Sequence, residues 1–412
     1  AIILLRLAFY NYCFHPGKTC SCWAMSRELQ AMSFGQCASF TLQWLILSKN
    51  LPSDGSRLIA QIPTTITHFA MPSDKILLTG ATGFIGSYLL RHLVAEGHTG
   101  ILALKRRGSP MDLVTEVADK VEWAEADLLD VPALGEAMQG VSKVYHCAAV
   151  VSFNDKDGKR MQKINREGTA NVVNIALEEG IGRLVHVSSI AALGRTRENG
   201  LVNEQTKWQD GPWNSPYGIS KHLAEMEVWR GAAEGLNVAV VNPSNVMGSG
   251  FWEGRTSTGQ MFYKIWKGLP FCPVGGSGFV DVRDVARFTV RLMESNIVNE
   301  RYILNGENLA FKFLFDEIAG ALGVKPPGIR VNPFIRETAW RAAWLASKIT
   351  GKPAFITKQT ARASARTYRY DNAKSLAAFD FSYTPISQTI RETGAQFLQC
   401  AKEDFRPAVL DF

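Results

Sequence analysis

Tyr217 and Lys221 lie four residues apart, directly after a segment that is typical of a helix start. Ser215 is a residue type that accepts hydrogen bonds from the free N–H groups of a first helical turn, and Pro216 suits the first helical position. At this spacing both side chains project from one helix face. An ammonium beside a phenol stabilises the phenolate, so we expect Lys221 to lower the pKa of Tyr217 from ~10 and to make it a usable proton donor. The spacing alone is common, and a solvated helix face is the alternative.

A glycine-rich turn lies upstream of this pair. The chain runs from a short apolar strand beginning at Lys75, through Gly80, Gly83 and Gly86, into an amphipathic helix that stops at Gly97. Glycines in such a turn allow a tight bend and a close approach of a pyrophosphate to the helix N-terminus. The order strand, glycines, helix therefore predicts a dinucleotide site. The glycine spacing differs from the standard fingerprint, since it is Gly-x-x-Gly-x-x-Gly.

The residues after the second predicted strand bear on which dinucleotide is bound. An NAD site usually has an acidic residue there for the ribose 2′-hydroxyl, whereas an NADP site offers arginine to the 2′-phosphate. This chain has Lys105, Arg106 and Arg107 in that place. Cations pair with a phosphate that a carboxylate would repel, so the sequence favours NADP, with NAD as the second possibility. A solvated basic loop is the alternative interpretation.

Short apolar strands alternate with helical periodicity along the next part of the chain. This alternation predicts an α/β fold of the Rossmann type, with a doubly wound parallel sheet. Ligands bind outside the carboxyl ends of the strands in such sheets. The predicted strands are Ile101 to Leu104, Lys143 to Ala148, Arg183 to Val187 and Asn237 to Val241, and the predicted helices include Arg160 to Glu179 and Tyr217 to Glu234, ended by Gly180 and Gly235.

From Met71 onward the chain resembles the extended short-chain dehydrogenases/reductases, the NAD-dependent epimerase/dehydratase family. Within that family it is most similar to the dihydroflavonol-reductase-like and 3β-hydroxysteroid-dehydrogenase-like branch. Because many stretches of the chain match the family and occur in the family's order, similarity by chance is remote. The matching stretches are Thr79 to Gly86, Asp127-Leu128, His146 to Ala149, Asn165 with Gly168-Thr169, Val187 to Ser189, Tyr217 to Lys221, Asn242-Pro243 and Phe279 to Ala286.

The resemblance implies a catalytic set of Ser189, Tyr217 and Lys221. Ser189 would hydrogen-bond the substrate oxygen, Tyr217 would donate a proton, and Lys221 would bridge the phenol and the ribose hydroxyls. Ser189 has an alternative role in satisfying local backbone, and Asn165 an alternative role in bracing it. Asp127 would contact the adenine. The residues expected to bind the cofactor are Gly80, Thr82, Gly83, Phe84, Ile85, Gly86, Arg106, Asp127, Leu128, Ala148, Ala149, Asn165, Tyr217, Lys221 and Pro243.

Two classes of reaction fit these residues. The favoured function is an NADP-dependent oxidoreductase that reduces a carbonyl, or oxidises an alcohol, of a small apolar molecule. The alternative is a nucleotide-sugar epimerase or dehydratase with tightly bound NAD(P). Residues Gly275 to Asp281 lack the arginine that would hold a sugar diphosphate, although Arg255 and Arg283 could compensate. A non-catalytic, cofactor-bound scaffold is a third possibility, disfavoured by the intact Ser189, Tyr217 and Lys221.

The second part of the chain is expected to determine the substrate. Residues 71–242 are predicted to form the dinucleotide-binding domain, and residues 243–412 mainly a smaller substrate lobe with segments that return to the first domain. An aromatic-rich stretch could line an apolar pocket, although its helical spacing is more typical of a core. Its members are Phe251, Trp252, Phe262, Tyr263, Trp266 and Phe271.

Residues 1–70 differ from the rest, with no sustained periodicity, four cysteines and few acids, and we expect a leader that is not part of the fold. An upstream translated region before Met71 is the favoured interpretation, and an organellar transit peptide is the second. The cysteines of the leader lack the paired spacing that would favour a zinc site. Elsewhere the scattered histidines and cysteines suggest no metal site, and Cys147, Cys272 and Cys400 are expected to be buried or half-buried thiols of a reducing, cytoplasmic compartment. A formal charge of +7 with no recognition motif does not favour nucleic acid.

Basic residues and tryptophans alternate between Arg330 and Arg369. This pattern predicts an amphipathic helix over or near the substrate lobe, and contact with a membrane surface is a less favoured possibility. The expected partner is a small-molecule substrate, and a homodimer with a second copy of the chain is a further option.

Overall fold

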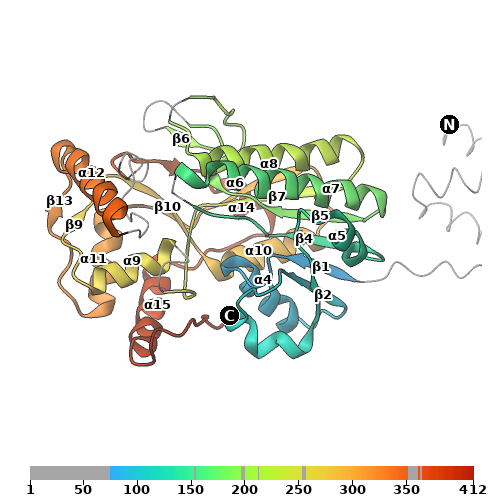
Figure 1. Ribbon diagram of the computed structural model, residues 1–412, viewed down its shortest axis with the longest axis horizontal. Coiled ribbons are helices and arrows are strands. Elements are labelled where there is room, and N and C mark those ends of the chain that lie inside the picture. Colours follow the sequence, from blue (N-terminus) through green and yellow to red (C-terminus); the bar gives the residue numbers. More distant parts are fainter. Residues whose placement is uncertain are drawn as a thin grey trace, which may run out of the picture. The chain divides into compact units, whose positions relative to one another are not determined.

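The computed structural model describes residues 75–152, 155–195, 200–211, 213–252, 257–350, 361 and 364–412. The leader predicted over residues 1–70 lies outside this part of the chain. A seven-stranded sheet forms the centre of the fold (Figure 1). Its strands are β1 (Ile76–Thr79), β2 (Ile101–Lys105), β3 (Glu122–Glu125), β4 (Lys143–His146), β5 (Arg183–Val187), β7 (Val238–Pro243) and β11 (Glu300–Leu304).

The order β11-β7-β5-β4-β1-β2-β3 makes the sheet doubly wound, because the chain adds strands outward from β1 on one side and from β4 on the other. Every neighbouring pair is parallel. The predicted fold class is therefore confirmed. The predicted strands are all present, and their ends lie within two residues of the predicted ones.

Apolar side chains alternate between the two faces of the sheet, and helices cover both. In β1, Leu78 points into one core and Leu77 into the other. The first core is covered by α4 (Phe84–Ala95), the 3₁₀ helix η1 (Asp112–Lys120) and α10 (Val282–Glu294). The second is covered by α5 (Val131–Met138), α7 (Gly168–Glu178) and α8 (Pro216–Ala233).

The helix predicted over Arg160 to Glu179 contains an irregular turn. It runs as α6 (Gly158–Gln162), the π-helical segment η3 (Lys163–Glu167) and α7. Gly180 and Gly235, the predicted stops of α7 and α8, have φ of 64° and 107°, a backbone region that favours glycine.

A smaller lobe follows β7. Its three-stranded sheet, β12-β10-β8, and its helices enclose an aromatic core in which Trp252, Phe262 and Phe397 are fully buried. The aromatic stretch therefore contributes core more than pocket lining. The elements are β8 (Asn245–Met247), α9 (Ser257–Trp266), β9 (Phe271–Cys272), β10 (Gly276–Asp281), β12 (Glu307–Ala310), α11 (Phe311–Leu322), β13 (Ile329–Arg330), α12 (Pro333–Thr350) and α15 (Ile386–Cys400).

The remaining short elements are η2 (Asp155–Asp157), η4 (Ile190–Ala192), β6 (Leu201–Val202), β14 (Arg369–Tyr370) and α14 (Ala373–Ala378), of which α14 contacts β11. β14 pairs with β6 in parallel. Among the residues that the structure describes, no helix is both long and apolar enough to cross a membrane.

The glycine turn sets how closely α4 approaches β1. A Cβ atom at Gly86 would lie 2.1 Å from the carbonyl oxygen of Gly80, which is far inside van der Waals contact with backbone. Gly80 itself has a φ of 72°. The third glycine of the motif is therefore required by the packing of helix against turn, before any ligand is considered.

We expect Gly86→Ala to destabilise the fold by ~1–3 kcal/mol, because the added methyl group meets backbone that can move only with α4. Gly135→Ala is the matched control: it lies within α5, and its Cβ would meet nothing within 4 Å. That substitution should be neutral or stabilise by up to ~1 kcal/mol. Urea unfolding followed by circular dichroism measures both, and an unchanged midpoint for Gly86→Ala would contradict the packing argument.

Candidate active site

The glycine turn and the N-terminus of α4 form one part of the candidate site. The N–H of Gly83 donates to the oxygen of Gly80 over 2.9 Å, and no side chain caps the first turn of α4. A Cβ atom at Gly80 would lie 2.7 Å from the backbone of Ala148, so the turn touches the loop after β4. The free N–H groups and the close backbone approach fit the pyrophosphate of a dinucleotide.

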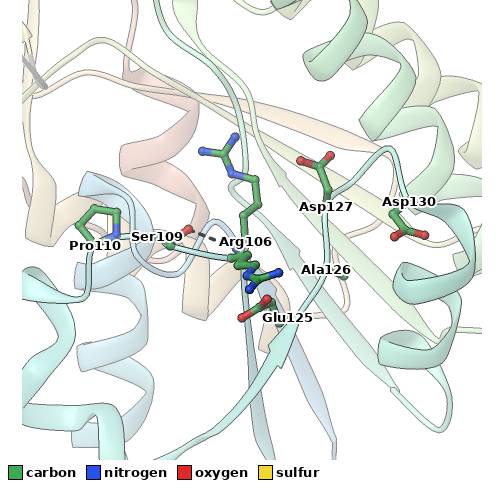
Figure 2. Close-up of a pocket in the computed structure, with 9 residues that line it drawn as sticks. Arg106, Ser109, Pro110, Glu125, Ala126, Asp127 and Asp130 are labelled. Atoms are coloured by element: carbon green, nitrogen blue, oxygen red, sulfur yellow. Dashed lines mark hydrogen bonds between the residues drawn. The ribbon is translucent and has the colours of Figure 1, made fainter.

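A cavity of about 500 Å³ opens at the carboxyl ends of β2 and β3 (Figure 2). Arg106 and Arg107 line one side, in a turn where Ser109 Oγ accepts from the N–H of Arg106 over 3.2 Å. Carboxylates line the other side: Glu125, Asp127 and Asp130. Cations and carboxylates thus share the cavity, and of these carboxylates only Asp127 was predicted from sequence.

Ser189 and Tyr217 form a hydrogen-bonded pair at the carboxyl end of β5. Ser189 caps the short helix η4, where its hydroxyl also accepts from the N–H of Ala191 over 3.1 Å. The predicted start of α8 is confirmed, since Ser215 Oγ accepts from the N–H of Gly218 over 3.0 Å. Two side chains 28 positions apart in the chain therefore converge where a reacting oxygen would need them.

Lys221 is buried one turn further along α8. Its Nζ donates to the carbonyl oxygen of Val187 over 2.9 Å. Burial lowers the pKa of Lys221 from its ordinary 10.5 to about 8, and the negative charge of Glu225 opposes this change. At neutral pH the ammonium form therefore predominates.

The pKa of Tyr217 differs from the expectation drawn from sequence. Burial raises this pKa above its ordinary value, and the hydrogen bond from Ser189 offsets part of the rise. In this structure Ser189, rather than Lys221, is the neighbour that favours the phenolate. The physical reason is that the Lys221 ammonium is directed to the end of β5, at the oxygen of Val187.

Glu225, one further turn along α8, holds the strand ends together. Its carboxylate accepts from Ser188 Oγ over 2.6 Å and from Asn242 Nδ2 over 2.8 Å, and it pairs with Arg301 over 3.1 Å. Asn242 in turn donates to the carbonyl oxygen of Ser189 over 3.1 Å. The carboxylate thus links α8 to β5, β7 and β11 and positions the backbone that presents Ser189.

Asn165 lies in the π-helical segment η3 and is fully buried. Its Oδ1 accepts from the N–H of Val150 over 2.7 Å, and its Nδ2 donates to the oxygen of Val150 and to Ser220 Oγ. Ser220 lies on α8 between Tyr217 and Lys221. These contacts tie the loop after β4 to the catalytic helix, which is the bracing role considered as the alternative; its predicted contact with cofactor stays a prediction.

His146 is part of a chain of hydrogen bonds in which the donor and the acceptor of each bond can be assigned. Thr169 Oγ1 donates to the carbonyl oxygen of Asn165 over 2.6 Å, so its contact of 2.9 Å with His146 Nε2 requires that nitrogen to be protonated. His146 Nδ1 then accepts from Thr79, whose Oγ1 accepts from the N–H of Ala148. Burial lowers the pKa of His146 to about 3, so the ring is a neutral support for the loop after β4.

The other residues predicted from sequence occupy the same edge of the sheet. Thr82, Gly83, Phe84 and Ile85 are at least partly accessible, as are Ala148 and Ala149. Leu128 and Pro243 are buried, and their predicted cofactor contacts stay predictions. Within the described part of the chain, no three histidine, cysteine or acidic side chains are grouped as a metal site. Cys272 and Cys400 are buried free thiols and Cys147 is half-buried, as expected.

Comparison with known protein families identifies the family to which the chain belongs. The model of the NAD-dependent epimerase/dehydratase family matches residues 76–304, more than half of the chain. The chain belongs to this family. It is therefore an NAD(P)-dependent enzyme of the extended short-chain dehydrogenase/reductase type, as the resemblance in sequence implied.

Two curated relatives and one solved structure illustrate the similarity. A putative dihydroflavonol 4-reductase from Synechocystis is 28% identical over 336 residues, which cover 79% of this chain and 95% of the relative. Sterol demethylase protein B from Methylococcus capsulatus is 33% identical over 262 residues, covering 62% and 77%. The crystal structure of gox2253 aligns with a TM-score of 0.68 and 31% identity, over 79% of this chain and 98% of that one.

Glu225 and Asn242 are the members of this epimerase/dehydratase site that were not among the residues predicted from sequence. A signal for Glu225 was present, because it follows Lys221 by four residues and so lies on the same face of α8. A carboxylate on a face expected to be buried needs a cation or donors nearby. Its partners on β5, β7 and β11 could not be identified without the fold.

We expect Glu225→Gln to destabilise this enzyme by ~2–4 kcal/mol, because the change leaves the buried ammonium of Lys221 without its counterion and weakens the contact with Arg301. We expect the loss of stability to be near the lower end of this range, because Arg301 is partly exposed and Lys221 can lose its proton. Glu227→Gln on the same helix is the control, since its partners are the exposed Arg166 and the half-exposed Arg230, and such surface ion pairs contribute less than ~1 kcal/mol. Urea unfolding at neutral pH should separate the two variants; equal midpoints would refute the role assigned to Glu225.

Proposed function

We propose that this enzyme is an NADP-dependent reductase that transfers hydride to the carbonyl of a small, apolar molecule, or runs the reverse oxidation. The hydrogen-bonded pair of Ser189 and Tyr217 is the observation that supports it best. The pair lies at the carboxyl end of β5, on the edge of the sheet that also bears the glycine turn. If the hydroxyls of Ser189 and Tyr217 both bound a carbonyl oxygen, Ser189 would polarise the carbonyl and Tyr217 would protonate the same oxygen.

Each residue of the site has a separate task in this proposal. Ser189 orients the substrate oxygen, and Tyr217 donates its phenolic proton to that oxygen. Lys221, charged at neutral pH, would hold the ribose hydroxyls of the cofactor, and the hydrogen bond from Ser189 stabilises the phenolate that the proton transfer leaves. The nicotinamide supplies the hydride when it is bound. Because burial raises the pKa of Tyr217, the phenol is kept protonated before the reaction.

The preference for NADP rests on the cavity at the ends of β2 and β3. Arg106 and Arg107 are exposed there and can give charge-assisted hydrogen bonds to a 2′-phosphate. Lys105 is less available, since its ammonium lies 5.8 Å from the ring centre of Trp123. We assign Asp127 to the adenine side of the cavity, where its Oδ1 accepts from the N–H of Leu129 over 2.9 Å.

A nucleotide-sugar substrate is disfavoured by the surroundings of Arg283. This arginine, considered above as a partner for a diphosphate, instead pairs with Asp281 over 2.7 Å and with Glu392 over 2.6 Å. Arg255 lies outside the described residues. The names of the two curated relatives refer to a dihydroflavonol and to a sterol, which are fused-ring molecules without a diphosphate, and this agrees with a small ring compound rather than a nucleotide sugar as substrate of the present enzyme.

We expect NADPH to bind at least about tenfold more tightly than NADH, since each charge-assisted contact to the 2′-phosphate adds ~1.5–3 kcal/mol. Arg106→Asp should remove most of this preference while affinity for NADH changes little. Arg391→Asp, an exposed arginine of α15, controls for the change in net charge. Fluorescence titration of both cofactors decides the matter, and equal affinities in the unmodified enzyme would exclude the proposed selectivity.

We expect Tyr217→Phe to bind NADPH normally and to lose ~10²- to 10⁴-fold in turnover, because only the proton donor is removed. Ser189→Ala should lower turnover with cofactor affinity intact, whereas Lys221→Met should reduce both. The substrate is first identified by following NADPH oxidation with aldehydes, ketosteroids, flavanonols and nucleotide sugars. Near-normal turnover of Tyr217→Phe on that substrate would rule out a tyrosine-dependent reductase, and turnover of nucleotide sugars alone would favour the epimerase class.

A further inference from the structure

Helix α12 exposes its large apolar side chains to solvent. Phe334 and Ile349 have 76% and 78% of their surface exposed, and Trp344 and Leu345 have 54% each. No residue of α12 whose side chain is described is buried. The helix lies at the outer end of the smaller lobe (Figure 1). An exposed apolar group is ordinary when it is isolated, but four on one 18-residue helix require an explanation.

Three of the four exposed groups share one side of the helix, and Trp344 lies about 80° from Phe334 around the helix axis. At 3.6 residues per turn, positions 334, 345 and 349 fall within about 60° of one another. The less exposed positions lie mostly opposite, and they include Ile335, Ala339, Trp340 and Ala343. A helix that packs on a protein core normally keeps its large apolar groups on the inner side alone, whereas α12 has large apolar groups on both sides. The outer side of α12 therefore offers an apolar surface to something other than the lobe.

Cations flank the apolar side. Arg341 and Lys348 are both exposed, and each lies near a tryptophan of the helix: the Arg341 guanidinium is 4.6 Å from the ring centre of Trp340, and the Lys348 ammonium is 5.7 Å from that of Trp344. Glu337, which pairs with Arg341 over 3.0 Å, is the acidic residue of the helix. The helix therefore has a positive net charge beside its apolar surface.

We propose that α12 docks in the surface of a bilayer that contains anionic lipids. Phe334, Leu345 and Ile349 would enter the boundary between head groups and acyl chains, with Trp344 at the level of the head groups. Arg341 and Lys348 would meet the lipid phosphates. The charged residues of α12 make this a helix that lies in the interface plane.

Charge favours a lipid surface over a second copy of the chain as the occupant. In a two-fold dimer through this side, the same patch of both copies meets, so the exposed cations Arg341 and Lys348 of one copy would be brought toward the cations of the other. An anionic bilayer instead matches both features of the helix, because it offers negative phosphates next to an apolar layer.

Sedimentation of the full chain with vesicles tests the proposal. We expect binding to vesicles of phosphatidylcholine that also contain phosphatidylserine, weaker binding to phosphatidylcholine alone, and loss of binding as salt is raised. Phe334→Ser combined with Ile349→Ser should weaken partitioning by at least about tenfold, since both apolar anchors are removed. Arg341→Glu combined with Lys348→Glu should abolish the preference for phosphatidylserine.

Val131→Ser combined with Val298→Ser is the matched control, because these exposed apolar residues belong to the larger domain and should not affect vesicle binding. Because all of these substitutions are at exposed positions, we expect each variant to fold, and urea unfolding measures whether it does. Absence of vesicle binding by the unmodified chain overturns the proposal. Equal binding by the α12 and control variants also overturns it, and so does a dimer in light scattering that the α12 substitutions dissociate.

Discussion

A buried ammonium at Lys221 is the constraint on which the candidate site depends. A charge in the interior must have a counter-charge and donors or acceptors around it, and Glu225 supplies the counter-charge one helical turn away. The same carboxylate binds Ser188, Asn242 and Arg301, so satisfying it requires α8, β5, β7 and β11 to be in register. The arrangement that keeps Lys221 charged is thus also the one that places the backbone of Ser189.

The opposite side of the cleft depends on close backbone contact instead of charge. Gly80, Gly86 and Ala148 bring the first turn, α4 and the loop after β4 together without any side chain between them. The neutral ring of His146 then supports this loop from within the core. The two parts meet at the switch point between β1 and β4, where a doubly wound sheet leaves a crevice. A rigid crevice of this kind suits a cofactor that must be held in one orientation.

The smaller lobe combines a closed aromatic core with an exposed apolar helix. Trp252 and Phe262 are buried in the core of the lobe, so they do not line a substrate pocket. α12 has the opposite character, since four of its large apolar side chains are exposed. If the substrate is apolar, as proposed, a lobe docked on lipid would lie close to the phase in which such a molecule concentrates. Binding of substrate and binding of membrane would then be properties of the same lobe.

The sequence by itself determined the features that depend on near neighbours in the chain. The strands, the glycine turn and the start of α8 at Ser215 all follow from residues within a few positions of one another, and the structure agrees with each. The spacing also placed Tyr217 and Lys221 one turn apart on α8. Only the tertiary structure decided what each side chain contacts. Burial reversed the expected direction of the Tyr217 pKa, and Asp281 and Glu392 engaged Arg283. Desolvation and ion pairing depend on groups that are distant in sequence, so they cannot be predicted from the residues that neighbour a position in the chain.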